Sequence, residues 1–185
     1  MLLAGRLQPP AIRARRTALA LSAVSVAFSI AFGFALRRWI FLDDEDFVSV
    51  WLTAALFMLL IALLLRMIAA ICELLWLERT WTNLPEELRK VGPMENVSSA
   101  MLFGFAFVPV FAWFWKLGLV VGIADGFESV RASRPFRAPV PKKLGMAAVI
   151  IGWVPGLNVY LAPFLWEMFA RRIDAVCIEL GAGPG

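Results

Sequence analysis

The chain has 185 residues, of which 61% are hydrophobic and 17% are charged, and its formal net charge is +4. Soluble domains are nearer about 45–50% apolar and about 25% charged. The composition therefore excludes a disordered chain. It predicts a small multi-pass membrane protein that forms one membrane domain over residues 1–185.

The sequence contains no histidine, which excludes Ser-His-Asp catalysis and histidine-ligated zinc or haem. The two cysteines, Cys72 and Cys177, form no CxxC motif. Phosphate-binding and hydrolase signatures are also missing from the sequence. We therefore assign no catalytic, cofactor-binding or metal-ligating residue, and we predict that the protein is not an enzyme.

The first hydrophobic segment covers about residues 17–39. Thr17–Leu36 carries no charge, and its length of about 30 Å as a helix matches the hydrocarbon core of a bilayer. The preceding residues are basic, which favours an uncleaved signal anchor, with a mitochondrial presequence as the alternative. A stripe of small residues predicts close contact with another helix; it consists of Ser22, Ser25 and Ser29.

The second segment covers about residues 47–81. Its uncharged part is Phe47–Leu65, and the helical pattern continues beyond Arg66 to about Trp81. Arg66 lies near the predicted inner interface, where its side chain either snorkels to the head groups or serves as an intramembrane charge. An acidic run, Asp43–Asp46, precedes the segment and is expected to cap its N-terminus; a cation site is the alternative.

The third segment covers about residues 98–124 and contains Pro109 and one charge, Lys116. For Lys116 we expect Glu73 or Glu167 as an ionic partner and Trp113 as a cation–π partner. A glycine zipper follows, and it predicts close helix packing within the monomer or between protomers. Its residues are Gly118, Gly122 and Gly126.

A basic, proline-rich connection covers residues 125–143. Its cations are expected to contact anionic lipid head groups, or only to set the orientation in the membrane. They are Arg131, Arg134, Arg137, Lys142 and Lys143.

The fourth segment covers about residues 144–170 and contains Pro155 and Asn158. Aligning Pro109 with Pro155 gives an offset of 46 residues and matches Phe107–Pro109 to Trp153–Pro155. The third and fourth segments therefore form a candidate internal repeat, each with an apolar arm, a Val-Pro break and a second arm.

Two topologies remain open for these Pro-broken segments. If both span, nine flanking Lys and Arg residues lie inside and seven outside, whereas re-entrant hairpins give fourteen inside and two outside. Against the hairpins, a turn within hydrocarbon requires its backbone groups to be hydrogen-bonded or covered. Both topologies put the N- and C-termini in the cytoplasm.

The residues around the two breaks resemble a pattern in small, uncharacterised bacterial multi-pass membrane proteins. That pattern is Val/Ile-Pro-x-x-Asn-x-Trp/Tyr within an apolar run, and the resemblance covers about residues 97–178. Asn158 keeps the asparagine of the pattern, whereas Ala112 replaces it in the first copy. The resemblance implies a bacterial cytoplasmic membrane location.

Together these features predict an all-α integral membrane protein with four hydrophobic helical segments. Its expected role is that of a structural or interaction subunit, in contact with the bilayer, other membrane subunits or a second copy, and not with nucleic acid. A small channel or transporter component is the alternative. Its polar lining would come from Arg66, Lys116 and Asn158.

Overall fold

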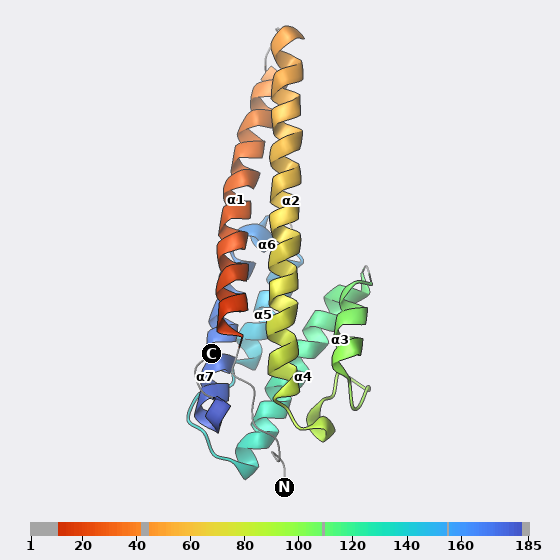
Figure 1. Cartoon of the computed structure of the whole chain (residues 1–185), viewed down its shortest axis with the longest axis vertical. Coiled ribbons are helices and arrows are strands. Elements are labelled where there is room, and N and C mark those ends of the chain that lie inside the picture. Colours follow the sequence, from red (N-terminus) through yellow and green to blue (C-terminus); the bar gives the residue numbers. More distant parts are fainter. Residues whose placement is uncertain (1–10, 42–44, 109, 155, 183–185) are drawn as a thin grey trace. The chain divides into compact units, whose positions relative to one another are not determined.

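The structure is a computed structural model that describes residues 11–41, 45–108, 110–154 and 156–182. Within these ranges the chain is helical and forms no β-strand, so the predicted all-α fold is confirmed for them (Figure 1). The elements are α1 (Ile12–Phe41), α2 (Glu45–Thr82), η1 (Glu86–Leu88), α3 (Ser99–Ala106), α4 (Phe111–Ser133), α5 (Lys142–Gly152), α6 (Leu157–Tyr160), α7 (Ala162–Cys177) and η2 (Ile178–Ala182).

The chain divides into two compact units, where the sequence alone predicts one domain. The helix-pair unit comprises Arg16–Cys72, and the hairpin unit comprises the remaining described residues. The boundaries fall inside α1 and α2, so each of these helices contributes residues to both units.

The helix-pair unit is built on the long helices α1 and α2. The stretches Ile12–Arg38 and Val50–Thr82 are long and apolar enough to cross a membrane, which is compatible with a membrane location. Ser25 Oγ donates a hydrogen bond to the carbonyl of Ala62 at 3.1 Å. Small side chains let two helices approach closely; the buried ones here are Ala18, Ser22, Ser25, Ala35, Ala55, Ala62 and Ala69.

The third predicted segment is two helices rather than one continuous helix. Helix α3 ends at Ala106 and α4 begins at Phe111. The two helices pack together, because the Phe105 and Trp115 rings lie 4.8 Å apart and Trp115 Nε1 donates to the Leu102 carbonyl at 3.2 Å. Pro109, the predicted point of the break, lies outside the described residues.

The fourth predicted segment is divided in the same way, into α5, the short helix α6 and α7. Helices α5 and α7 pack along one another. A Cβ on Gly145 of α5 would lie 2.7 Å from the Phe169 ring of α7, so the absence of a side chain permits this contact. Pro155 also lies outside the described residues.

The two hairpins lie side by side and point in the same direction. At one end, the rings of Phe114 on α4 and Trp153 on α5 are 5.8 Å apart. At the other end, Lys142 Nζ lies 2.7 Å from Asp125 Oδ1. The turns α3–α4 and α5–α6 are therefore the tips, and the charged connection forms the common base.

The turns repeat the same backbone geometry at the predicted offset of 46 residues. Val110 has a φ of 63° and Gly156 a φ of 85°, and each precedes the following helix. The N–H of Ala112 donates to the Val108 carbonyl at 2.9 Å, and the matching residues Asn158 and Val154 do the same at 3.0 Å. The internal repeat therefore extends to the backbone of the turns.

Candidate functional site

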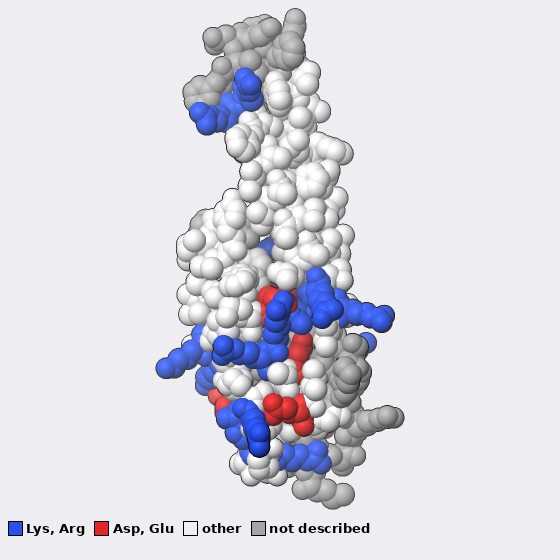
Figure 2. Space-filling view, turned by 90° about the vertical axis from the view of Figure 1, so that its left-hand side faces the viewer, with Lys and Arg blue, Asp and Glu red and all other residues white. Residues whose placement is uncertain are grey.

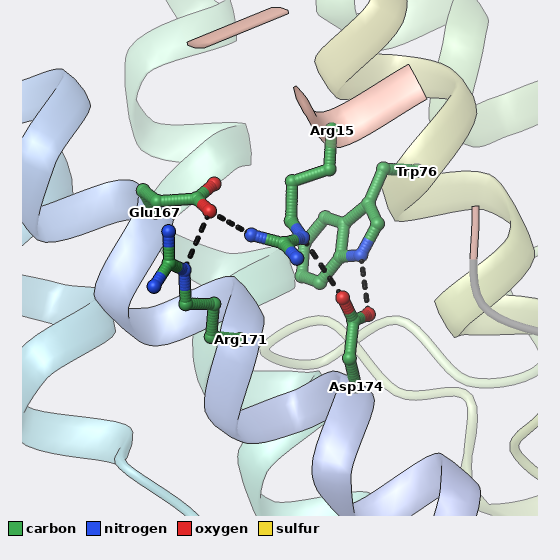
Figure 3. Close-up of polar contacts among 5 residues, drawn as sticks. All are labelled: Arg15, Trp76, Glu167, Arg171 and Asp174. Atoms are coloured by element: carbon green, nitrogen blue, oxygen red, sulfur yellow. Dashed lines mark hydrogen bonds and ion pairs between the residues drawn. The ribbon is translucent and has the colours of Figure 1, made fainter. Parts of the chain in front are cut away.

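A buried cluster of ions in the hairpin unit joins the start of α1 to α7 (Figure 3). Arg15 Nε donates to Asp174 Oδ2 at 2.8 Å, and Arg15 Nη1 donates to Glu167 Oε1. The exposed fractions of Arg15, Glu167 and Asp174 are 7%, 6% and 3%. One guanidinium therefore holds two buried carboxylates that lie two turns apart on α7.

Two further donors complete the cluster. Trp76 Nε1 of α2 donates to Asp174 Oδ1 at 2.8 Å, so both oxygens of this carboxylate are bonded. Arg171 Nε donates to Glu167 Oε1 at 2.8 Å from the solvent side. Figure 3 shows the two carboxylates converging on the Arg15 guanidinium.

Burial raises the pKa of Asp174 above its ordinary value, because removal from water disfavours the charged form. The hydrogen bond from Trp76 and the charge of Arg15 act in the opposite direction. With both oxygens bonded and a cation in contact, the cluster has the chemistry of a structural clamp, not of a proton-transfer site.

An aromatic core surrounds this clamp. The Trp76 ring meets Trp166 edge-on at 5.8 Å and Phe169 edge-on at 6.2 Å. Trp76 and Phe169 are fully buried. Edge-to-face contacts of this kind add to the stabilisation from burial alone, so α2 and α7 are joined by packing as well as by the Trp76–Asp174 bond.

Lys116 of α4 forms a second ion pair beside the same core. Its Nζ lies 2.7 Å from Glu73 Oε2, one of the two partners that the sequence predicts. The same Nζ lies 4.1 Å from the centre of the Trp166 ring. Trp166 on α7 therefore takes the cation–π position expected for Trp113, whose side chain is exposed.

The glycines of the predicted zipper face the chain's own connection between α2 and α3. A Cβ on Gly118 would lie 2.7 Å from the Val91 side chain. On Gly122 it would lie 2.2 Å from the Lys90 carbonyl oxygen, and on Gly126 it would lie 2.8 Å from Leu84. The neighbour is mainly the connection between α2 and α3, joined at Gly122 by the Trp81 ring of α2, rather than a helix with a matching glycine face.

The serine stripe contacts Arg66, one of the three predicted polar residues, whereas the other two, Lys116 and Asn158, lie on α4 and α6. In the helix-pair unit, Ser22 and Ser25 are buried, Ser29 Oγ bonds to the Ser25 carbonyl, and Arg66 Nη1 donates to Ser22 Oγ at 3.3 Å. Asn158 lies on α6, near a hairpin tip. Lys116 of α4 lies beside Glu73.

The predicted connection 125–143 is shorter in the structure, because α4 continues to Ser133 and α5 begins at Lys142. The cations predicted for it divide into two groups. Arg131 donates to the Ala138 carbonyl at 2.8 Å and lies over the Phe136 ring, and Lys142 pairs with Asp125. The other three, which are exposed, are Arg134, Arg137 and Lys143. Figure 2 shows on one face that lysine and arginine side chains gather around acidic side chains.

The sequence alone places Arg15 within the basic stretch before the first hydrophobic segment and does not predict its partners. A signal existed on α7, where Glu167, Arg171 and Asp174 recur at helical spacing within an amphipathic stretch. No pattern in the neighbouring sequence relates that face of α7 to residue 15.

The predicted acidic cap is not described, since Asp43 and Asp44 lie outside the described residues. Among those residues, no group of three or more Cys, Asp or Glu is placed to hold a metal ion.

Over the described residues, the chain is thus a helical protein with two helices long and apolar enough to cross a membrane, and its hairpin unit holds a buried ionic clamp and two packed hairpins. No protein-family model, curated protein or solved structure matches the chain.

Proposed function

We propose that the chain is a non-enzymatic integral membrane protein whose two long helices span the bilayer and whose two hairpins enter a single leaflet from the same side. In this arrangement it serves as a structural or interaction subunit at that membrane surface. The observation that carries the proposal is the common direction of the hairpins, with Phe114 against Trp153 at the tips and Lys142 against Asp125 at the base.

The lengths of the entering arms support a single leaflet. Helix α3 has 8 residues and α5 has 11. At about 1.5 Å per residue these helices are about 12 Å and about 16 Å long, close to half of a hydrocarbon core of about 30 Å. A helix that crossed the whole core would need about 20 residues.

The surface of the hairpins has the polarity that such an insertion requires. Large apolar side chains are exposed around both tips, where water would disfavour them and lipid chains would not. They include Phe107, Val110, Trp113, Phe114, Tyr160 and Phe164. The exposed cations Arg134, Arg137 and Lys143 lie at the base, where anionic head groups would attract them.

The backbone at the turns supports burial in hydrocarbon. The N–H of Val108 donates to the Phe105 carbonyl at 3.3 Å, and that of Val154 donates to the Ile151 carbonyl at 3.1 Å. The carbonyls of Val108 and Val154 in turn accept from the following helix. Proline, which has no N–H, stands at positions 109 and 155 of the sequence. The hydrogen bonds at the turns and the missing proline N–H groups therefore reduce the number of unpaired backbone groups that a turn within hydrocarbon would bury.

The proposed role as an interaction subunit rests on an apolar surface that the chain itself does not cover. The zipper glycines and the buried serines of α1 are covered by the chain itself. Helix α2 nevertheless exposes a long apolar face, which includes Leu56, Leu60, Leu63, Met67 and Ile71. Chemical crosslinking in native membranes, followed by purification, should give a defined oligomer or complex through this face. Leu60→Trp should weaken it, and a crosslinked product unchanged by such variants contradicts the proposed surface.

The topology is tested by labelling single cysteines with a membrane-impermeant reagent. In a background that lacks Cys72 and Cys177, Glu87→Cys and Ser133→Cys report on the two connections that flank the first hairpin, and both positions are exposed. We expect both to label from the same side of sealed vesicles. Labelling from opposite sides contradicts re-entrant hairpins and favours a spanning third segment.

A further inference from the structure

The hairpins make the protein asymmetric across the bilayer. If the proposed topology holds, α1 and α2 contribute equally to both leaflets, whereas α3, α5, α6 and the apolar parts of α4 and α7 add volume to only one. We infer that the hairpin unit is a wedge that favours membrane surfaces that are convex on the side of its basic base. The inference rests on the proposed function and extends it from topology to membrane shape.

The tips have the chemistry to recognise such a surface. Convex curvature spreads the head groups of the outer leaflet and opens gaps in which hydrocarbon meets water. Bulky apolar side chains that enter these gaps remove both surfaces from water. Phe107 at the first tip is 68% exposed, and Phe164 beside the second is 59% exposed. The partner that fits this surface is therefore the acyl-chain region of one curved leaflet.

The charged base determines which leaflet the hairpins enter and expand. Arg134, Arg137 and Lys143 are exposed there, and Arg172 is exposed on α7. Charged side chains resist entry into hydrocarbon, so they hold the base at the level of the head groups while the tips are immersed. Their charge also selects a leaflet rich in anionic lipids. The wedge thus has a defined depth and direction.

A wedge must also keep its two hairpins at a fixed spacing. The hairpins are joined along their length, by Phe114 against Trp153 at the tips and Lys142 against Asp125 at the base. Between these points, a Cβ on Gly145 would lie 2.5 Å from the Val120 side chain, which leaves no space between α4 and α5. The tips are therefore fixed in their spacing by close packing.

The test uses the full chain, fluorescently labelled and reconstituted into giant vesicles that contain anionic lipid, from which a narrow membrane tube is pulled. Orientation is read with an impermeant reagent from Ser133→Cys in the background that lacks Cys72 and Cys177. Molecules whose base faces the outside should be enriched several-fold in the tube relative to the flat membrane. Molecules whose base faces the lumen should be depleted, because the inner leaflet of a tube is concave.

This reversal of sign needs no change at the hairpin tips, because both orientations are compared in the same chain, which carries the exposed Ser133→Cys reporter. Phe107→Ala with Phe164→Ala should remove most of the enrichment. The matched control, Phe34→Ala with Phe57→Ala, replaces similarly exposed phenylalanines of the long helices and should leave the enrichment unchanged.

Equal density in tube and flat membrane for both orientations would overturn the inference, as would enrichment that does not change sign with orientation. The proposed function is judged separately. Labelling of Glu87→Cys and Ser133→Cys from the same side, together with no sorting, rejects the wedge alone. Labelling from opposite sides rejects the hairpin topology, and the wedge with it.

Discussion

The guanidinium of Arg15 lies 2.8 Å from the carboxylate of Asp174, although 159 positions separate the two residues in sequence. Both side chains are buried, and the same guanidinium contacts Glu167. A single cation therefore joins the start of α1 to α7, and removing it would leave Asp174 buried without a cation and Glu167 with Arg171 alone.

Arg15→Met should destabilise the protein by about 3–5 kcal/mol, because it leaves Asp174 buried without a cation and Glu167 with only the exposed Arg171 as its partner. Combining it with Glu167→Gln and Asp174→Asn removes the charges as well and should recover most of the loss. Unfolding in mixed detergent micelles measures the free energy of unfolding of Arg15→Met and of the triple variant. If the triple variant is no more stable than Arg15→Met, the loss comes from packing and not from charge.

Gly122→Ala should destabilise by about 1–3 kcal/mol, because the new Cβ would lie 2.2 Å from the backbone oxygen of Lys90 and the connection would have to move. The matched control is Gly104→Ala on α3, where nothing lies within 4 Å of the added Cβ. The control should stabilise by about 0.5–1 kcal/mol through helix propensity. Equal effects of the two substitutions would contradict the close approach at Gly122.

Val110→Gly should stabilise the first hairpin by about 1 kcal/mol. Val110 holds a φ of 63°, a region that is costly for a β-branched residue and open to glycine. The repeat supplies the reciprocal experiment, since Gly156 has a φ of 85° at the matching position, and Gly156→Val should destabilise. Thermal unfolding in one detergent compares the unfolding temperatures of the two variants with that of the unchanged protein. Shifts of the same sign would contradict a turn geometry shared by the two hairpins.

Cys177 should resist alkylation in the folded protein. Burial raises the pKa of its thiol to about 12, so the neutral form persists far above neutral pH. Because the folded pKa is raised, the associated stability is complete below the ordinary value of 9.0 and is lost as the pH rises through about 12. In a Cys72→Ala background, mass spectrometry should detect modification only when denaturant is added. Rapid modification at neutral pH under native conditions would contradict this burial.

Lys116→Met should destabilise by about 1–3 kcal/mol, because Glu73 loses a charged hydrogen-bond partner in a largely apolar setting. Adding Glu73→Gln should restore part of that loss. The exposed pair Lys90–Glu95 is the control, and Lys90→Met should have no measurable effect, because water screens the pair. Equal effects at Lys90 and Lys116 would show that the Lys116 pair is screened as well.

The sequence predicts the approximate place of the hydrophobic segments, because a charge-free run has a length that physical chemistry relates directly to helices. It does not predict all of their ends, since α4 continues to Ser133, beyond the predicted end at residue 124. Helix α2 ends at Thr82, one residue beyond the predicted boundary near Trp81. The prolines of the third and fourth segments predict a break in each of them, whereas the charge tally leaves open whether the broken segments span the membrane or re-enter, and that choice stays a prediction. The repeat at 46 residues also followed from local identity.

The clamp could not be found in the same way. Arg15, Trp76 and Asp174 belong to three helices, and no sequence periodicity relates one helix to another. The partner of the glycine face was hidden for a similar reason. The spacing of Gly118, Gly122 and Gly126 predicts a close neighbour, but not that the neighbour is the connection from Leu84 to Val91. Pairings between distant elements depend on the completed packing.

The clamp also has a consequence for the order of events during synthesis. Arg15 leaves the ribosome 159 residues before Asp174 does. At about 5–20 residues per second that interval is about 8–32 seconds. Throughout it, the start of the first helix carries a cation whose partners do not yet exist. Completion of α7 is therefore the step that closes the hairpin unit, and a chain released before that point would present an unpaired arginine that quality control could recognise.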